Sequence, residues 1–277
     1  VVVPYSTANL EAANRSGTLY LPEGAIPMLP DAALARFGLG LSDTSRALSF
    51  RMDIDDTGMI TAVGVMPSFV KVTRTTYADA DAVSGTGPLA ELARLALVRY
   101  RYRQRNGAVD IDIPEVRVWL DDGVPMVSAV RRYRSSVVVR EMMVLAGEGL
   151  ARWAFERNLP FPYYSQEAPA TRETEKPVPD SLADSLSDID RGDTERLLAA
   201  LCAPPESLAA EFARRRTMRA GMAGVQPRAH QGLGVTMYAQ ATSPLRRYGD
   251  LLGHQQVRAW LATEAGEPST PANLWHG

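Results

Sequence analysis

Cysteine, histidine and long apolar runs are scarce in this sequence, and each scarcity excludes a class of protein. Its 277 residues include one cysteine, Cys202. A single thiol excludes a disulfide framework and a cysteine-rich zinc site, and it fits a reducing compartment. His230 and His254 have no third metal ligand at useful spacing. No apolar run approaches the ~18 residues of a membrane span, and no signal peptide is visible. We therefore expect a cytoplasmic protein without a membrane partner.

Lysine is also rare, occurring only at Lys71 and Lys176, so arginine supplies nearly all of the positive charge. The formal net charge is −2. A chain with this balance is not an obvious binder of polyanions as a whole, and a nucleic-acid site would have to be a local basic patch. Guanidinium groups do supply planar donors that suit phosphate.

The length allows one large domain or two small ones, and 45% hydrophobic with 22% charged residues is typical of a globular protein. Predicted helices and strands are interleaved without regular βαβ order, which favours an α+β fold with a mixed or antiparallel sheet and surrounding helices. We expect one domain over residues 1–265 and a tail or linker over 266–277. The absence of an initiator Met suggests that the sequence begins inside a domain.

Several elements follow from periodicity and from capping signals. The stretch Asp53–Gly58 lies between two alternating apolar segments, which predicts a β-hairpin with an acidic turn. Residues 166–194 are polar and predict a loop. The helices are expected at 7–15, 32–37, 88–106, 136–158, 194–201, 205–216 and 243–263, and the strands at 108–113, 115–121 and 124–131.

The helix from Pro88 is the longest clear one, and it carries a run of alternating arginine and tyrosine. Its apolar stripe is predicted to consist of Leu89, Leu92, Leu95 and Ala96. The run spreads around the helix cylinder, so a solvated face is the favoured interpretation and an RNA groove the alternative. Its members are Arg99, Tyr100, Arg101, Tyr102, Arg103 and Arg105.

The segment 241–261 carries the strongest chemical signal. Thr242 or Ser243 caps a predicted helix and Pro244 begins it, so Arg246 and Arg247 fall in the first turn. Cations are unfavourable at this positive end of the helix dipole. Either a nearby acid or a bound anion can offset the cost, and the converging N–H groups and guanidinium forks favour a phosphate.

The sequence resembles the RNB domain of ribonuclease II and ribonuclease R over about residues 10–260. The closing signature of that family is a His-x-Gly-Leu-Gly, a Tyr, and then Thr-Ser-Pro-x-Arg-Arg-Tyr-x-Asp-x-x-x-His. Segments similar to other parts of the family occur in the expected order. The matching residues are His230–Gly234, Tyr238, Thr242–Asp250 and His254, with 15–30, 74–77, 106–116 and 140–151 upstream.

The resemblance implies a 3′→5′ exoribonuclease that hydrolyses single-stranded RNA to nucleoside 5′-monophosphates. It implies that Arg246 binds the phosphate at the cleavage site, with Arg247 as its basic neighbour. Tyr20 and Tyr77 match aromatic residues near the RNA. Aromatic rings stack on bases at ~1–3 kcal/mol per base without reading sequence. A second stacking position falls on Ile111, which has no π face.

Two further positions bear on the resemblance. Glu141 lies in the acidic and apolar helix segment of the family, where a structural role is the expectation. The family's helix asparagine is Gly147 here.

The family's Mg²⁺-binding aspartates follow the pattern Asp-x5-Asp-x-Asp-Asp and lie upstream of the segment that matches 15–30. None of the nineteen residues before Tyr20 is Asp. Asp53-Ile54-Asp55-Asp56 has the core of that pattern, but position 47 is Ala47 and the stretch lies after Pro27–Pro30. A hairpin turn is therefore favoured over a metal site. Mg²⁺ is expected in the complete protein, with its ligands outside this sequence.

Two other interpretations remain open at this point. One is a catalytically silent RNB-like protein that binds RNA, which Ile111 and the missing aspartates favour. The other is a phosphate-binding hydrolase of a different class that uses the same helix terminus.

Overall fold

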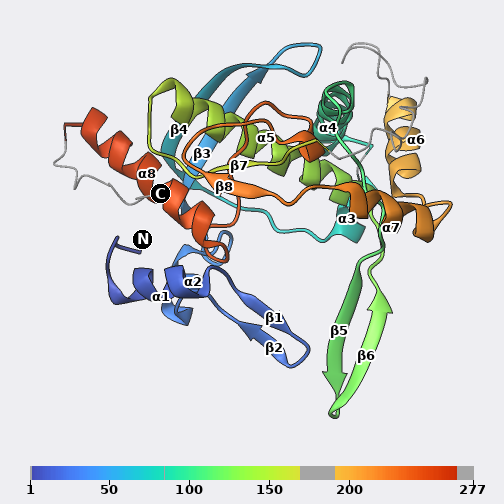
Figure 1. Ribbon diagram of the computed structural model, residues 1–277, viewed down its shortest axis with the longest axis horizontal. Coiled ribbons are helices and arrows are strands. Elements are labelled where there is room, and N and C mark those ends of the chain that lie inside the picture. Colours follow the sequence, from blue (N-terminus) through green and yellow to red (C-terminus); the bar gives the residue numbers. More distant parts are fainter. Residues whose placement is uncertain (1, 84, 169–190, 267–277) are drawn as a thin grey trace.

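Figure 1 shows the computed structural model, which describes residues 2–83, 85–168 and 191–266. Its helices are α1 (Thr7–Arg15), α2 (Asp31–Phe37), α3 (Tyr77–Val83), α4 (Gly87–Arg105), α5 (Arg134–Glu156), α6 (Arg191–Cys202), α7 (Leu208–Thr217) and α8 (Tyr248–Glu264). Its strands are β1 (Leu19–Leu21), β2 (Gly24–Ile26), β3 (Ser45–Ile54), β4 (Ile60–Val70), β5 (Val116–Asp121), β6 (Val124–Ala129), β7 (Tyr163–Ser165) and β8 (Met222–Gly224).

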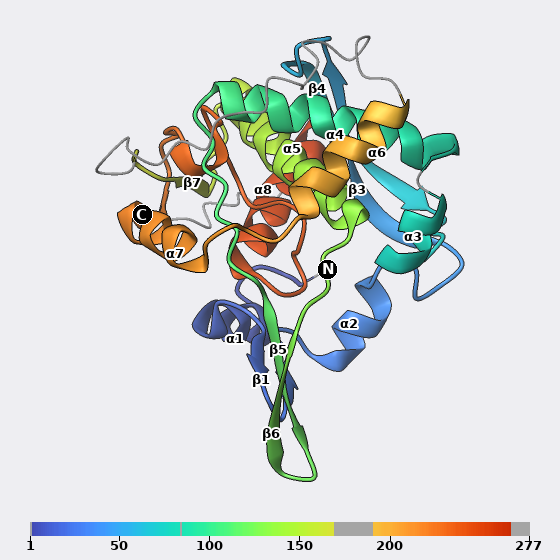
Figure 2. The ribbon, with the colours of Figure 1, turned by 90° about the vertical axis from the view of Figure 1, so that its right-hand side faces the viewer.

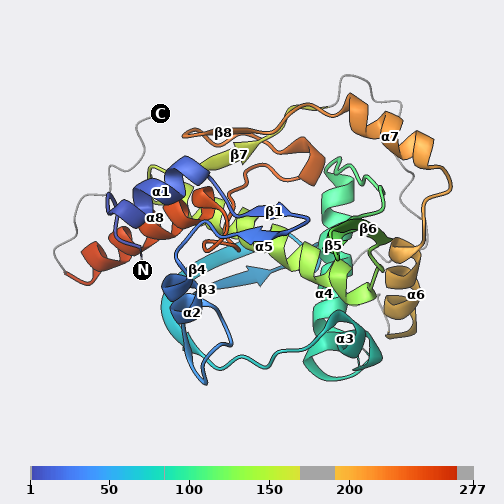
Figure 3. The same ribbon diagram turned by 90° about the horizontal axis from the view of Figure 1, so that it is seen from below.

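The strands form antiparallel pairs, β1 with β2, β3 with β4, β5 with β6 and β7 with β8. Helix α5 lies between the β3–β4 hairpin and the β7–β8 ribbon (Figure 3). This arrangement confirms the predicted α+β class. No helix in the described ranges combines the length and the apolar character that a bilayer crossing demands.

Two hydrophobic clusters share α5. The larger one packs the C-terminal half of α5 against β4, β7 and α8, and it includes Trp153 and Phe161. The Trp153 ring meets Trp260 edge-on, with centroids 5.0 Å apart. The second cluster joins α4, α5 and α6 through residues such as Leu97 and Leu198. Burying one such side chain contributes ~1.5–3 kcal/mol. Because both clusters include residues of α5, the neighbouring helices and strands pack around this helix.

The acidic stretch forms the predicted hairpin turn. Oδ1 of Asp55 accepts hydrogen bonds from the backbone N of Thr57 (3.0 Å), the hydroxyl of Thr57 (2.7 Å) and the backbone N of Met59 (3.0 Å). The hydroxyl contact from Thr57 is the main reason that the pKa of Asp55 is lowered. Gly58 has φ +93°, a conformation that favours glycine. The carboxylate is therefore occupied in shaping the turn.

The apolar stripe predicted for α4 is confirmed only at Ala96, which is buried. Leu92 is 39% exposed, and the buried side of the helix also carries Ala93, Leu97 and Tyr100. Small side chains let neighbouring helices approach closely. The buried face of α4 therefore follows its alanines, and the spacing of the leucines does not predict it.

The solvated face predicted for the arginines of α4 is wrong for Arg99, Arg101 and Arg103, which are buried, whereas Arg105 is exposed. Nε and Nη2 of Arg103 donate to the two carboxylate oxygens of Glu141 at 2.8 and 2.6 Å. The Arg99 guanidinium, one turn before Arg103 on α4, donates to Glu148 of α5 and to the carbonyl of Gly58. Two buried ion pairs thus fasten α4 to α5.

Two predicted elements differ clearly from the structure, and two other predictions lie mostly outside the described residues. Residues 108–113 form no strand, because their backbone is held by side chains and loops instead of a neighbouring strand. Helix α8 begins at Tyr248, five residues later than expected, since residues 244–246 form a turn. Most of the predicted polar loop (169–190) and of the predicted tail (267–277) lies outside the described residues, and the domain boundary at 265 stays a prediction.

Two hairpins leave the body of the molecule together. The β5–β6 hairpin extends away from the helices with β1 beside it (Figure 2). The backbone N of Leu120 donates to the carbonyl of Pro22 at 3.3 Å, which joins β5 to the turn between β1 and β2. Both hairpins expose apolar side chains, including Val116 at 59% and Leu19 at 52%.

We predict that Arg103→Met lowers the free energy of unfolding by ~3–5 kcal/mol, because it leaves the Glu141 carboxylate buried without its main partner. Urea denaturation measures this change. The double variant Arg103→Met/Glu141→Leu should recover most of the loss. Arg196→Gln is the matched control, since its pair with Asp193 is exposed and contributes at most ~1 kcal/mol. Equal effects of Arg103→Met and Arg196→Gln would contradict a buried, energetically important pair.

Candidate phosphate site at the start of helix α8

Asp250 organises the turn that leads into α8. This carboxylate is fully buried in the first turn of the helix. Its Oδ2 accepts hydrogen bonds from the backbone N of Ser243 (2.7 Å) and from Nη2 of Arg247 (2.8 Å). The backbone N–H groups of Arg246 and Arg247 both donate to the carbonyl of Ser243 at 3.0 Å. These hydrogen bonds hold the turn in place from Ser243 to Asp250.

The two neighbouring arginines have different environments. The charge of Arg247 is neutralised by the carboxylate of Asp250. Of the two alternatives predicted from the sequence, a nearby acid or a bound anion, the acid applies to Arg247. Arg246 is exposed, and no carboxylate of the described residues forms an ion pair with it. An anion held near the start of α8 would therefore meet the Arg246 guanidinium, while Arg247 fixes the turn.

A short backbone pairing brings Tyr20 towards this turn. The backbone N of Thr18 donates to the carbonyl of Arg246 (3.0 Å), and the backbone N of Tyr248 donates to the carbonyl of Ser16 (2.9 Å). A Cβ on Gly17 would lie 3.1 Å from the Arg246 carbonyl oxygen, so glycine allows the close approach. Tyr20 follows two residues later in β1 and is 67% exposed. The structure thus places an exposed ring and an exposed guanidinium on adjacent segments.

Tyr164 and Tyr238 lie beneath the turn. A Cβ on Gly249 would overlap the Tyr164 hydroxyl, and a Cβ on Gly147 would overlap the Tyr238 ring. Burial is the main cause that raises the pKa of both phenols, and the charge of Asp250 adds to it. Both phenols are therefore neutral at physiological pH. The Tyr238 ring and the Ala239 carbonyl oxygen leave no room for a Cβ at position 147.

Neither His230 nor His254 takes part in an exposed site. Nε2 of His254 lies 2.7 Å from the carbonyl oxygen of Ala241, and its ring meets Phe50 edge-on. Asp250, four residues before His254 on α8, pairs with Arg247. The His230 ring meets Tyr238 edge-on, with centroids 5.7 Å apart. Burial lowers the pKa of both imidazoles.

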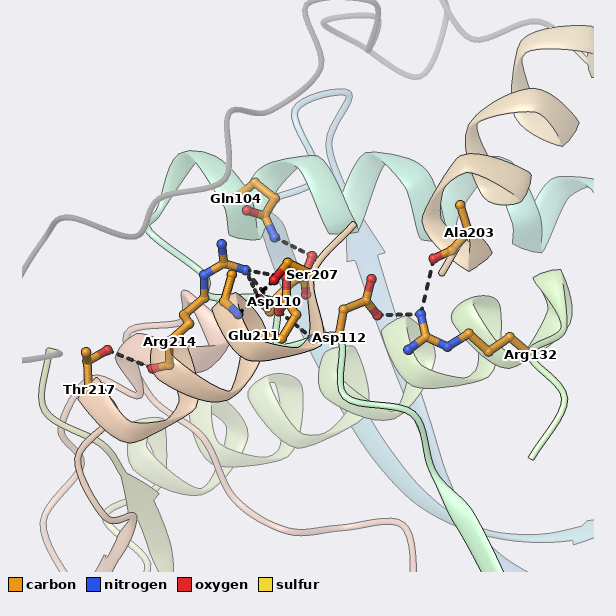
Figure 4. Close-up of polar contacts among 10 residues, drawn as sticks. Gln104, Asp110, Asp112, Arg132, Ala203, Ser207, Glu211, Arg214 and Thr217 are labelled. Atoms are coloured by element: carbon orange, nitrogen blue, oxygen red, sulfur yellow. Dashed lines mark hydrogen bonds and ion pairs between the residues drawn. The ribbon is translucent and has the colours of Figure 1, made fainter. Parts of the chain in front are cut away.

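Ile111 lies in a segment whose backbone is clamped on both sides. Glu211 of α7 accepts a hydrogen bond from the backbone N of Asp112 (2.9 Å), and Arg214 donates to the carbonyl of Asp110 (3.3 Å). Figure 4 shows these contacts, with Gln104 donating to the Asp110 carboxylate at 3.0 Å. Ile111 itself is half-buried. The segment is held in place by charged and amide side chains.

Tyr77 lies at the start of α3, where its ring stacks on Tyr133 with centroids 6.0 Å apart. It is 45% exposed. No hydrogen bond or ring contact between described residues joins Tyr77 to Arg246 or Tyr20. The structure therefore brings Tyr20, Arg246 and Arg247 together and leaves Tyr77 and Ile111 on other segments.

The described residues do not fit a metal ion. Across 2–83, 85–168 and 191–266, no three Asp, Glu, His or Cys side chains come together as ligands. We therefore assign no metal-dependent step to this chain.

Sequence reasoning missed Arg103, Glu148 and Tyr164. The signal for the ion pairs was present, because Arg99 and Arg103 are four residues apart and Glu141 and Glu148 are seven apart. Both spacings place the residues on one helix face. The signal for Tyr164 was absent, since only the tertiary fold brings it under Gly249.

The fold and the site define an α+β domain in which the exposed guanidinium of Arg246 lies just before the start of α8. The family model of the RNB domain matches residues 1–263. The chain belongs to the RNB family.

Curated relatives match over nearly the whole chain. An uncharacterised ribonuclease of Synechocystis sp. is 35% identical over 274 residues, which cover 96% of this chain and 37% of that protein. The chloroplastic/mitochondrial ribonuclease II of Arabidopsis thaliana is 29% identical over 275 residues, covering 94% of this chain and 31% of that protein. The chain thus spans about a third of the length of these relatives.

Solved structures share the fold. RNase R of Mycoplasma genitalium in complex with ribose-methylated single-stranded RNA superposes with a TM-score of 0.75 at 18% identity, covering 96% of this chain and 45% of that one. An active-site mutant of the Dss1 exoribonuclease of Candida glabrata gives 0.74 at 21% identity, covering 97% and 35%. Yeast Ssd1, a pseudonuclease, gives 0.66 at 16% identity, covering 97% and 35%.

We predict that His254 makes the protein less stable as the pH falls below ~6.5, the pKa of an unperturbed histidine. Its folded pKa is lowered, so the unfolded chain binds the proton first and the free energy of unfolding decreases. His254→Gln should remove this part of the dependence between pH ~7.5 and ~5.5 in urea titrations. Parallel stability curves for the two proteins would contradict the prediction.

We predict that Gly147→Ala destabilises the protein by ~1–3 kcal/mol, because the added Cβ meets the Tyr238 ring and the Ala239 carbonyl oxygen, the latter at 2.5 Å. Gly149→Ala in the same helix is the matched control. Its Cβ meets the flexible Met52 side chain at 2.7 Å, and the gain in helix propensity of ~1 kcal/mol offsets the contact. Thermal unfolding of both variants tests this, and a Gly147→Ala variant as stable as Gly149→Ala would refute it.

Proposed function

We propose that this domain serves a 3′→5′ exoribonuclease that hydrolyses single-stranded RNA to nucleoside 5′-monophosphates. The observation that carries the proposal is Arg246, an exposed guanidinium without an acid partner among the described residues, held on a turn that Asp250 fixes. In this proposal Arg246 binds the phosphate at the cleavage site and stabilises the charge that develops there.

Tyr20 supports the same assignment. It is exposed and lies two residues beyond the backbone pairing with Arg246, so its ring is available to a nucleotide beside the bound phosphate. Stacking on a ring tolerates any base, as an exonuclease that acts on RNA of any sequence requires. Ile111 and Tyr77 are proposed as further contacts to RNA, and Arg247 acts by holding the turn.

The comparisons support the proposal at the level of the class. Named relatives are ribonucleases, and similar solved structures include RNase R with bound single-stranded RNA. The complete protein would supply the aspartates for Mg²⁺ upstream of Val1, in the pattern Asp-x5-Asp-x-Asp-Asp. We also propose that it acts in the cytoplasm.

We predict that Arg246→Ala in the full-length protein lowers kcat for single-stranded RNA by ~10²–10³, the usual cost of removing one donor to a developing negative charge. Release of nucleoside monophosphates from end-labelled RNA measures the change. Arg46→Ala is the control, because Arg46 is an exposed arginine on β3.

Unchanged hydrolysis by Arg246→Ala would contradict the proposed phosphate-binding role of this residue. A wild-type protein that binds single-stranded RNA without releasing monophosphates would instead identify a silent RNB protein, in the manner of the pseudonuclease with the same fold.

A further inference from the structure

The charged residues between Glu211 and Asp250 are all basic. In a chain with a net charge of −2, residues 212–249 contain no Asp and no Glu. The same residues contain seven arginines. These are Arg214, Arg215, Arg216, Arg219, Arg228, Arg246 and Arg247.

The structure neutralises only the two ends of this stretch. Arg214 pairs with Glu211 at 3.0 Å, and Arg247 pairs with Asp250 at 2.8 Å. Besides Arg246, four arginines between these ends are exposed, and none of the four forms an ion pair with a described residue. We call these four residues the basic arm. They are Arg215, Arg216, Arg219 and Arg228.

The first end of the arm is anchored beside Ile111. Glu211 is the buried residue of α7, with 3% of its surface exposed, while Leu208 and Phe212 of the same helix are more than half exposed. The carboxylate of Glu211 holds the backbone N of Asp112 and the guanidinium of Arg214 (Figure 4). A polar clamp therefore fixes α7 against the segment that carries Ile111.

The second end is anchored near the start of α8. Strand β8 pairs with β7, in which Tyr164 lies opposite Ala223 and contacts Gly249 of α8. Gln166 holds both flanks of β8, since its side chain donates to the carbonyl of Arg219 (2.7 Å) and its backbone N donates to the carbonyl of Ala229 (3.1 Å). The arm is thus a fixed path from the Ile111 segment to the underside of the Arg246 turn.

The chemistry of the arm matches a single-stranded polyanion. Guanidinium groups offer planar forks to phosphate, and they retain their charge at any physiological pH. Phe212, 58% exposed on α7, adds a ring on which a base can stack. An acidic protein surface would satisfy the charge but would leave this ring unused.

We propose that the basic arm binds the phosphate backbone of single-stranded RNA along the nucleotides that precede the 3′ end. This inference rests on the proposed function and adds a second RNA-binding surface to it. The arm contributes to affinity for long RNA, and Arg246 contributes to hydrolysis at the end.

The test compares full-length wild-type protein with the triple variant Arg215→Gln/Arg216→Gln/Arg219→Gln. The matched control is Arg36→Gln/Arg46→Gln/Arg51→Gln, which removes three exposed arginines from α2 and β3. Each phosphate contact to a single strand contributes ~0.7 to the slope of log K against log salt, so loss of three contacts lowers the slope by ~2. We expect this change for the arm variant only, with a higher KM for long RNA and an unchanged kcat.

Several outcomes separate the two proposals. If the arm variant and the control bind long RNA with the same slope, the arm inference is overturned while the exonuclease proposal stands. If wild-type protein releases no monophosphates but the arm variant alone loses RNA binding, the arm stands and the proposed hydrolysis fails. If the arm variant keeps RNA binding and loses binding to polyglutamate, the arm is a site for an acidic protein. Melting temperatures equal to wild type confirm that each variant is folded.

Discussion

The guanidinium of Arg103 is the interaction on which the rest of the structure depends. It donates to both oxygens of Glu141 on α5, and its Nη1 donates to the carbonyl of Leu233 at 2.8 Å. Burial alone would lower the pKa of Arg103, but the hydrogen bonds and charge of Glu141 outweigh it and raise that pKa. One side chain thus ties two helices to the loop that leads towards Tyr238 and the start of α8. A buried charge is tolerated because its donors are largely satisfied.

Arginine does two opposite kinds of work in this molecule. Arg99 and Arg103 are withdrawn from water and behave as internal fasteners between helices. Arg246 and the basic arm stay in water and are not neutralised by described acids. The buried acids decide which arginines are neutralised: Glu148 pairs with Arg99, Glu211 with Arg214 and Asp250 with Arg247, while Glu141 pairs with both Arg103 and Arg140. Exposed arginines without such a partner among the described residues, such as Arg246, can bind an external anion.

Much of the fold could be predicted from local signals, and the failures have physical causes. The helix over 7–15 and the hairpin around Asp55 follow from caps, glycine and alternation, which act over a few residues. The prediction of a strand at 108–113 failed because Glu211 of α7, about a hundred residues away in the sequence, holds this backbone in place of a neighbouring strand. The predicted start of α8 was wrong because Asp250 stabilises a turn at Ser243, where a helix cap was expected. In the site, the motif indicated Arg246 and Tyr20, but only tertiary contacts reveal Tyr164 and the buried partners of α4.

The β5–β6 hairpin has a consequence for how the molecule behaves in solution. A ribbon of two strands is marginally stable by itself, and the open edge of a strand is a template for pairing with another chain. Val116, Val118, Val124 and Val127 are all exposed on this ribbon. An apolar, edge-bearing projection of this kind promotes self-association unless something shields it. The same feature that would let the domain engage a neighbour therefore sets an upper limit on the concentration at which it stays dispersed.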